Sequence, residues 1–315
     1  MLPRSAVCQP TEFASVRLVA ADGYRLQARL YESATAARGV VLIVPAMAVR
    51  QDFYAEFAAW LAARRWDALT FDFRGIGESA PRSLRGFETD ILTWARQDCA
   101  AALAFARDRA QSQPVIWIGH SLGGQVLAMT PGNDEIAAAV TVACGVGYWR
   151  ENAYPLRRYS WLLWHVIVPF ATALCGYFPG RRLGILGDLP KGVVEQWSRW
   201  CRNPEYAVGV EGSAMRQLYA RVTLPLLGIS FTDDEYMSER NIAVLHGFYA
   251  NAPRELRRLT PAEVGATRIG HFGFFRADVG RQLWPMALAW ADAATSRSPR
   301  TRVSRQRGDS PTSIL

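Results

Sequence analysis

The stretch from Val115 to Gly124 constrains this chain more than any other. Its first half is an apolar run with the length of a buried strand, and the residues from Leu122 onward have the spacing of a helix packed on a sheet. Ser121 therefore lies on a turn between a strand and a helix, framed by glycines at 119 and 123. This Gly-x-Ser-x-Gly pattern is typical of a nucleophilic serine, because such a sharp turn leaves no room for side chains at the glycine positions.

Further strands and helices alternate on both sides of this turn. Alternating polar and apolar residues at 15–19 and 25–31 predict two antiparallel strands at a sheet edge. Short connections between the later elements predict a mostly parallel sheet with helices on both faces. The remaining expected strands are 39–44, 68–71, 136–143, 225–231 and 255–259, and the expected helices are one capped by Asp52, 90–110, 242–248, and 284–294 with Pro285 in its first turn.

The alternation stops at Gly145 and resumes only near Thr223. The residues between are rich in tryptophan and interrupted by prolines, and a structureless loop of that length is improbable inside a compact domain. We therefore expect an α/β core formed by residues 1–144 and 217–294, with an inserted helical lid at 145–216. Residues 295–315 read as a basic, disordered tail.

A nucleophilic serine needs a base within hydrogen-bond distance and an acid that orients the base. The chain has only four histidines. His120 flanks Ser121 and is expected to project away from it, whereas His165 and His246 fall in helical patterns and read as structural, His165 as a hydrogen-bonded core residue. His271 lies in a glycine-flanked loop after the last strand, so it is the expected general base.

The acid should follow a strand that lies between the serine and the histidine in the chain. Asp233, Asp234 and Glu235 follow the strand at 225–231 directly. We favour Asp234, whose distance from the strand suits a carboxylate that turns back to the base, with Asp233 as the alternative. The same acidic cluster would also interact favourably with the dipole of the following helix.

The oxyanion of a tetrahedral intermediate requires hydrogen-bond donors. The backbone amide of Leu122, at the start of the helix after the serine, is one expected donor. The loop after the strand at 39–44 should supply the second, and Met47 is the expected residue.

With these residues in place, the chain resembles an α/β-hydrolase fold enzyme over almost its whole length. More narrowly, it is similar to bacterial serine hydrolases of the serine aminopeptidase and monoacylglycerol lipase-like branch. The resemblance rests on four motifs, which are the serine turn at 119–124, Asp72-x-Arg-Gly-x-Gly-x-Ser79, the acid turn with Asp234, and Gly270-His271-Phe272-Gly273. One departure concerns the Met47 loop, because many relatives carry His-Gly where this chain has Pro45-Ala46.

The resemblance implies a serine hydrolase that cleaves a carboxylic ester, amide or thioester of a small apolar substrate without a cofactor or metal. An inactive binding module and an acyltransferase on the same triad are the alternatives. Gly75-x-Gly77-x-x-Ala80 fits a dinucleotide-binding loop, but Pro81 interrupts the helix that would follow.

Charge and cysteine content indicate which partners and which cellular compartment to expect. The net charge is +8, and the tail carries five arginines against one aspartate, so the folded part is only mildly basic and a specific nucleic-acid partner is not expected. Five scattered cysteines and an N-terminus without an apolar signal segment favour a cytoplasmic protein. The apolar lid and the basic tail leave weak contact with a membrane surface open.

Overall fold

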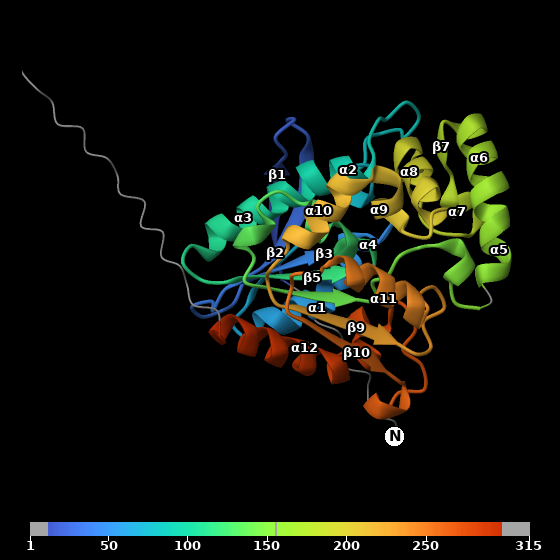
Figure 1. Cartoon of the computed structure of the whole chain (residues 1–315). Helices are drawn as coiled ribbons and strands as arrows, with labels where there is room; N and C mark the ends of the chain where they lie inside the picture. Colours follow the sequence, from blue (N-terminus) through green and yellow to red (C-terminus); the bar gives the residue numbers. More distant parts are fainter. Residues whose placement is uncertain (1–11, 155, 298–315) are drawn as a thin grey trace, which may run out of the picture.

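The computed structural model describes residues 12–154 and 156–297, and its centre is an eight-stranded sheet (Figure 1). The strand order is β1-β2-β4-β3-β5-β6-β9-β10. β1 and β2 pair antiparallel, β2 pairs antiparallel with β4, and the remaining neighbours are parallel. The strands are β1 Ala14–Val19, β2 Arg25–Tyr31, β3 Val40–Val44, β4 Asp67–Phe71, β5 Val115–His120, β6 Ala138–Val142, β9 Leu226–Phe231 and β10 Arg254–Leu259.

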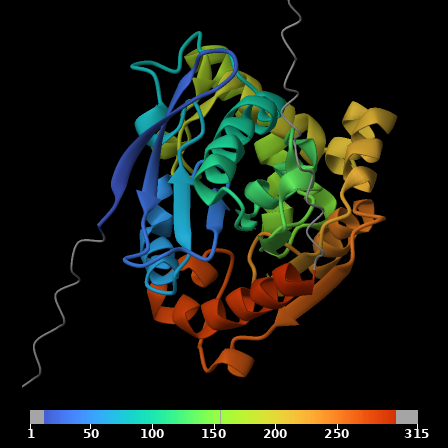
Figure 2. The same ribbon diagram turned by 90° about the vertical axis from the view of Figure 1, so that its left-hand side faces the viewer.

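Helices cover both faces of the sheet, so the central strands are apolar on both sides. In β3, Leu42 packs into one hydrophobic cluster and Ile43 into the other, as the two-residue period of a strand requires. One face is covered by α2 Ile91–Thr93, the π-helix Trp94–Cys99 and α3 Ala100–Ala110, and the other by α1 Ala55–Ala62 and α12 Ala277–Arg297. Figures 1 and 2 show α3 and α12 on opposite sides of the strands.

The segment between β6 and β9 folds into short helices and a two-stranded ribbon. In Figure 1 most of it lies to the right of the core, with α5 and α6 outermost, whereas α10 lies over the sheet. Its role as a lid, and the boundaries expected at 145 and 216, stay predictions. Its elements are α5 Leu156–Leu162, the π-helix Leu163–Ile167, α6 Val168–Cys175, β7 Tyr177–Phe178, α7 Gly180–Leu183, β8 Leu189–Pro190, α8 Lys191–Cys201, α9 Tyr206–Glu211 and α10 Ser213–Arg221.

Three helices differ from the expectation. The helix after Ser121 is short, because α4 Leu122–Gln125 passes at once into the 3-10 helix Val126–Met129. Asp52 lies inside the 3-10 turn Gln51–Tyr54 and does not cap α1. Pro285 lies in the interior of α12, which begins eight positions earlier, at Ala277, rather than at Trp284.

Residues 298–315, most of the expected tail, lie outside the described residues, as do residues 1–11. Within the described ranges, no helix combines the length and apolarity that crossing a bilayer requires.

The helix after β9, α11 Glu239–Phe248, completes the core beside β9 and β6.

Candidate active site

Ser121 occupies a strained turn at the carboxyl end of β5. Its backbone lies at φ 51° and ψ −111°, a region that residues other than glycine rarely adopt. The amide of Ser121 donates to the Val142 carbonyl oxygen at 2.9 Å, which fixes the turn against β6. A Cβ at Gly119 would lie 2.5 Å from the backbone of Gly123, and one at Gly123 would overlap the Val44 carbonyl. Both glycines are therefore required by close backbone contact.

His271 and Asp234 form a buried pair. The Nδ1 atom of His271 lies 2.9 Å from Asp234 Oδ2 and 3.1 Å from Oδ1, and each residue is only 5% exposed. The Oδ1 atom also accepts hydrogen bonds from the amides of Tyr236 at 2.8 Å and Met237 at 2.9 Å. These amides fix the carboxylate, and the carboxylate in turn orients the imidazole so that Nε2 is left to act as a base.

The two acids beside Asp234 hold the backbone of the histidine loop. Asp233 Oδ2 accepts from the amides of Ile269 at 2.8 Å and Gly270 at 3.1 Å, and Glu235 Oε2 accepts from the amide of His271 at 3.1 Å. Asp233 and Glu235 therefore hold the backbone of the loop, whereas Asp234 contacts the side chain of His271. The following helix, α11, is capped by Ser238 rather than by this cluster.

His120 supports the same loop from the core. Its Nε2 lies 3.0 Å from the His271 carbonyl oxygen, which can only accept, so Nε2 carries the proton. Its Nδ1 then accepts from the Tyr54 hydroxyl at 3.0 Å, and that hydroxyl accepts from the Ala46 amide at 2.9 Å. Burial, and secondarily the charge of His271, lowers the pKa of His120 well below its ordinary value, so the ring is neutral. Sequence patterns gave no signal for this Tyr54–His120 relay.

The other two histidines lie away from Ser121. His246 is buried, with Nε2 2.8 Å from the Thr141 hydroxyl, and burial lowers its pKa to about 4. His165 is exposed and stacks on Trp161 with ring centroids 5.3 Å apart, so its expected place in the core is wrong. The cause is that the helix around it is apolar on its outer face as well.

The expected oxyanion donors lie on two neighbouring segments. Gly123 packs against the carbonyl of Val44, which brings the start of α4 next to the loop after β3. Within the described residues, the amides of Leu122 and Met47 donate no hydrogen bond, so both are free to bind an oxyanion. The Ser121 hydroxyl likewise has no hydrogen-bond partner there; such contacts often tighten only when substrate binds.

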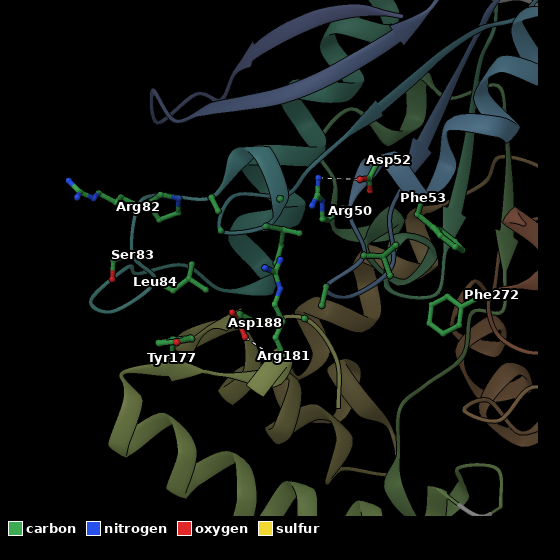
Figure 3. A pocket seen from close by; sticks show the side chains of 18 residues that line it. Arg50, Asp52, Phe53, Arg82, Ser83, Leu84, Tyr177, Arg181, Asp188 and Phe272 are labelled. Atoms are coloured by element: carbon green, nitrogen blue, oxygen red, sulfur yellow. Dashed lines mark hydrogen bonds and ion pairs between the residues drawn. The ribbon is translucent and has the colours of Figure 1, made fainter. Parts of the chain in front are cut away.

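A cavity of about 750 Å³ opens beside these residues (Figure 3). Ala48 and Phe272, the chain neighbours of Met47 and His271, line it, whereas Ser121 and His271 do not. In Figure 3, Phe53 and Phe272 lie at one end, and Arg181 extends into it from α7. A smaller cavity of about 350 Å³ is lined by the histidine loop itself, and His271 and Glu235 are among its lining residues. Among the described residues, no cluster of three or more His, Cys, Asp or Glu could hold a metal ion.

Comparison with known proteins identifies the fold of the chain. The family model described as serine aminopeptidase, S33, matches residues 35–175, which include the serine turn. The fold matches a monoglyceride lipase from Saccharomyces cerevisiae with a TM-score of 0.64, at 15% identity, over 95% of this chain and 100% of the other. The chain belongs to the α/β-hydrolase superfamily. The resemblance expected from the motifs is thus confirmed at this level.

Other α/β-hydrolases show the same likeness. A thermostable carboxyl esterase from Bacillus coagulans matches with a TM-score of 0.64, at 10% identity, over 90% of this chain and 99% of that one. An esterase from Pyrococcus furiosus matches with a TM-score of 0.58, at 15% identity, over 92% and 95%. No curated protein sequence matches this α/β-hydrolase significantly. Identities this low establish the fold, and function must be argued from the site.

Proposed function

We propose that this α/β-hydrolase is a serine hydrolase that cleaves a carboxylic ester through an acyl-enzyme on Ser121. The observation that carries the proposal is the buried pair of His271 Nδ1 and Asp234 Oδ2, 2.9 Å apart, together with a serine held in a strained turn. His120, the chain neighbour of Ser121, joins the two parts, because its Nε2 lies 3.0 Å from the His271 carbonyl oxygen. A carboxylate buried against one imidazole nitrogen leaves the other nitrogen to accept a proton from a nucleophile.

In the proposed reaction, His271 Nε2 takes the proton from the Ser121 hydroxyl as Oγ attacks the ester carbonyl carbon. The carbonyl oxygen becomes an oxyanion, which the amides of Leu122 and Met47 stabilise. The intermediate collapses, the alcohol leaves with the proton from His271, and the acyl group remains on Oγ. Water, deprotonated by His271, then attacks the acyl-enzyme, and the acid product and free Ser121 are released.

The substrate proposed is an ester with an apolar acyl or aromatic group. The large cavity supports this choice because Phe53 and Phe272 lie together at one end of it, and Phe272 is the chain neighbour of His271 (Figure 3). The proposal takes an ester as the bond that is cleaved, in line with the names of the monoglyceride lipase and the two esterases, whereas the matched family model is described as serine aminopeptidase. Acyl transfer would use the same residues, and no contact in the site favours it over hydrolysis.

Labelling with a fluorophosphonate probe tests the proposal, because the probe reacts only with an activated serine. The wild type should be labelled and Ser121→Ala should not. Ser83→Ala is the matched control, since Ser83 lines the large cavity but lies outside the proposed triad, and it should be labelled like the wild type. A wild type that stays unlabelled and does not hydrolyse short p-nitrophenyl esters would favour a binding module instead.

A further inference from the structure

The outermost helices of the molecule, α5 and α6 with the π-helix between them, form one apolar run. From Arg158 to Arg181 the chain has no acidic or basic residue except His165. A helix that is apolar all round is normally buried within a protein or in lipid. Within the described residues, no helix here has the length and apolarity to cross a bilayer.

One face of this run is buried against α8. Trp164 packs on Trp197 with ring centroids 4.8 Å apart, and the Ser198 hydroxyl donates to the Trp164 carbonyl at 3.2 Å. Val168 and Ala171 continue the buried face. Contacts at the start of the run add to this attachment, since the side-chain amide of Asn152 donates to the Ser160 hydroxyl at 3.1 Å.

The opposite face is equally apolar and lies exposed. Phe170 and Leu174 are 71% and 68% exposed, values that are high for large apolar side chains. The exposed residues at 159, 162, 166, 170 and 174 recur every three or four positions and so share one side of the helices, with Trp161 beside them. Figure 1 shows these helices, α5 and α6, at the outer edge of the molecule. We name this stripe the outer face; it consists of Tyr159, Trp161, Leu162, Val166, Phe170 and Leu174.

Arginines flank the outer face at both ends. Arg157 and Arg158 precede it, and Arg181 and Arg182 follow it on α7. Among the residues that the structure describes, none of the four forms an ion pair. An apolar stripe with tryptophan and tyrosine, bounded by unpaired arginines, has the composition of helices that lie in the plane of a membrane interface.

We propose that the outer face rests on the surface of a membrane that contains anionic lipids. Phe170 and Leu174 enter the acyl region, and Arg157, Arg158 and Arg182 contact lipid phosphates, whereas Arg181 lines the large cavity. Charge favours this occupant over a second copy of the chain, because a two-fold pairing of two outer faces would bring like-charged arginines together. The docking itself is independent of the proposed function.

Docking of the outer face would also bring the large cavity close to the membrane. The importance of this for catalysis rests on the proposed function. Tyr177 and Arg181, which directly follow the apolar run, line that cavity. A docked molecule would thus hold the cavity near the lipid surface, where esters with apolar acyl chains concentrate.

Vesicle co-sedimentation of the full-length protein tests the docking. The wild type should bind phosphatidylcholine vesicles that contain phosphatidylglycerol, and Ser121→Ala should bind equally, because binding does not need the nucleophile. Phe170→Glu and Leu174→Glu should each weaken binding by about tenfold or more. Leu256→Glu is the matched control, since Leu256 is 50% exposed on β10 and should leave binding unchanged.

Two further measurements distinguish docking of the outer face from binding through the basic residues after position 297 and from pairing with a second copy of the chain. Arg157→Gln and Arg158→Gln should each reduce the preference for phosphatidylglycerol about fivefold. The basic residues after position 297 are identical in all variants, so binding that persists in the Phe170→Glu/Leu174→Glu double variant would overturn the proposal. A concentration-dependent dimer that this double variant abolishes, without vesicle binding by the wild type, would identify a second copy as the occupant and also overturn it.

Discussion

Replacing Asp234 by asparagine should reverse the hydrogen bond that orients His271. In the wild type, Asp234 Oδ1 accepts from the amides of Tyr236 and Met237, at 2.8 and 2.9 Å. An asparagine must keep its carbonyl oxygen at that position, because an NH₂ group there would face two donors. Its NH₂ group therefore takes the place of Oδ2, 2.9 Å from His271 Nδ1, and donates to it.

This change places the imidazole proton on the wrong nitrogen. His271 would accept at Nδ1 and carry its proton on Nε2, so it could no longer take a proton from Ser121. The loss expected for this kind of tautomer reversal is about 10⁴ in kcat/KM, or roughly 5.5 kcal/mol of transition-state stabilisation. The hydrolysis of p-nitrophenyl butyrate and the rate of fluorophosphonate labelling measure it.

Asp233→Asn is the matched variant, because it changes the adjacent carboxylate in the same way. Asp233 Oδ2 accepts from two amides, whereas within the described residues its Oδ1 has no partner, so an asparagine can keep both bonds by placing its NH₂ group at Oδ1. Its kcat/KM should stay within about tenfold of the wild type. If Asp233→Asn loses activity while Asp234→Asn keeps it, the assignment of the acid is refuted.

Three other perturbations test the support of the site and the core. Tyr54→Phe leaves the Ala46 amide and His120 Nδ1 without their partner, so thermal and urea unfolding should show a loss of about 1–3 kcal/mol, together with a lower kcat. Gly123→Ala forces a Cβ onto the Val44 carbonyl and should lower both melting temperature and labelling, whereas Gly247→Ala, where a Cβ meets open space, should be tolerated. His246 has a folded pKa of about 4, below its unfolded value, so the unfolded state binds more protons between about pH 6.5 and 4. Stability measured by urea should therefore fall as pH drops through this window, by about 3 kcal/mol from this residue, and less steeply in His246→Gln.

Local sequence patterns predicted the elements that position the site. The spacing of Gly119, Ser121 and Gly123 identified the serine turn, because close backbone contacts at positions 119 and 123 exclude every residue except glycine there. Asp233 and Asp234 could not be separated in this way. They differ only in which direction each carboxylate points, and the fold of the loop around His271 decides that.

The incorrect predictions for the start of α12 and for the position of His165 have the same physical origin. Pro285 could not reveal that α12 begins eight residues before it, because the preceding turns are held by packing of Val279 and Leu283 against the core. His165 reads as a core residue only if an apolar helix is covered on every side. Both depend on what lies across the helix, which one sequence does not record.

The loop after β3 shows how a departure from the usual motif is compatible with an oxyanion donor. Pro45 has no amide hydrogen, and the Ala46 amide is engaged by the Tyr54 hydroxyl at 2.9 Å. The Val49 amide donates to the Ala46 carbonyl at 3.2 Å, closing a turn in which Ala48 adopts φ 61°. Met47 therefore carries the first amide after the strand that is free among the described residues. Because Tyr54 also bonds His120, which holds the carbonyl of His271, one hydroxyl couples this loop to the proposed base.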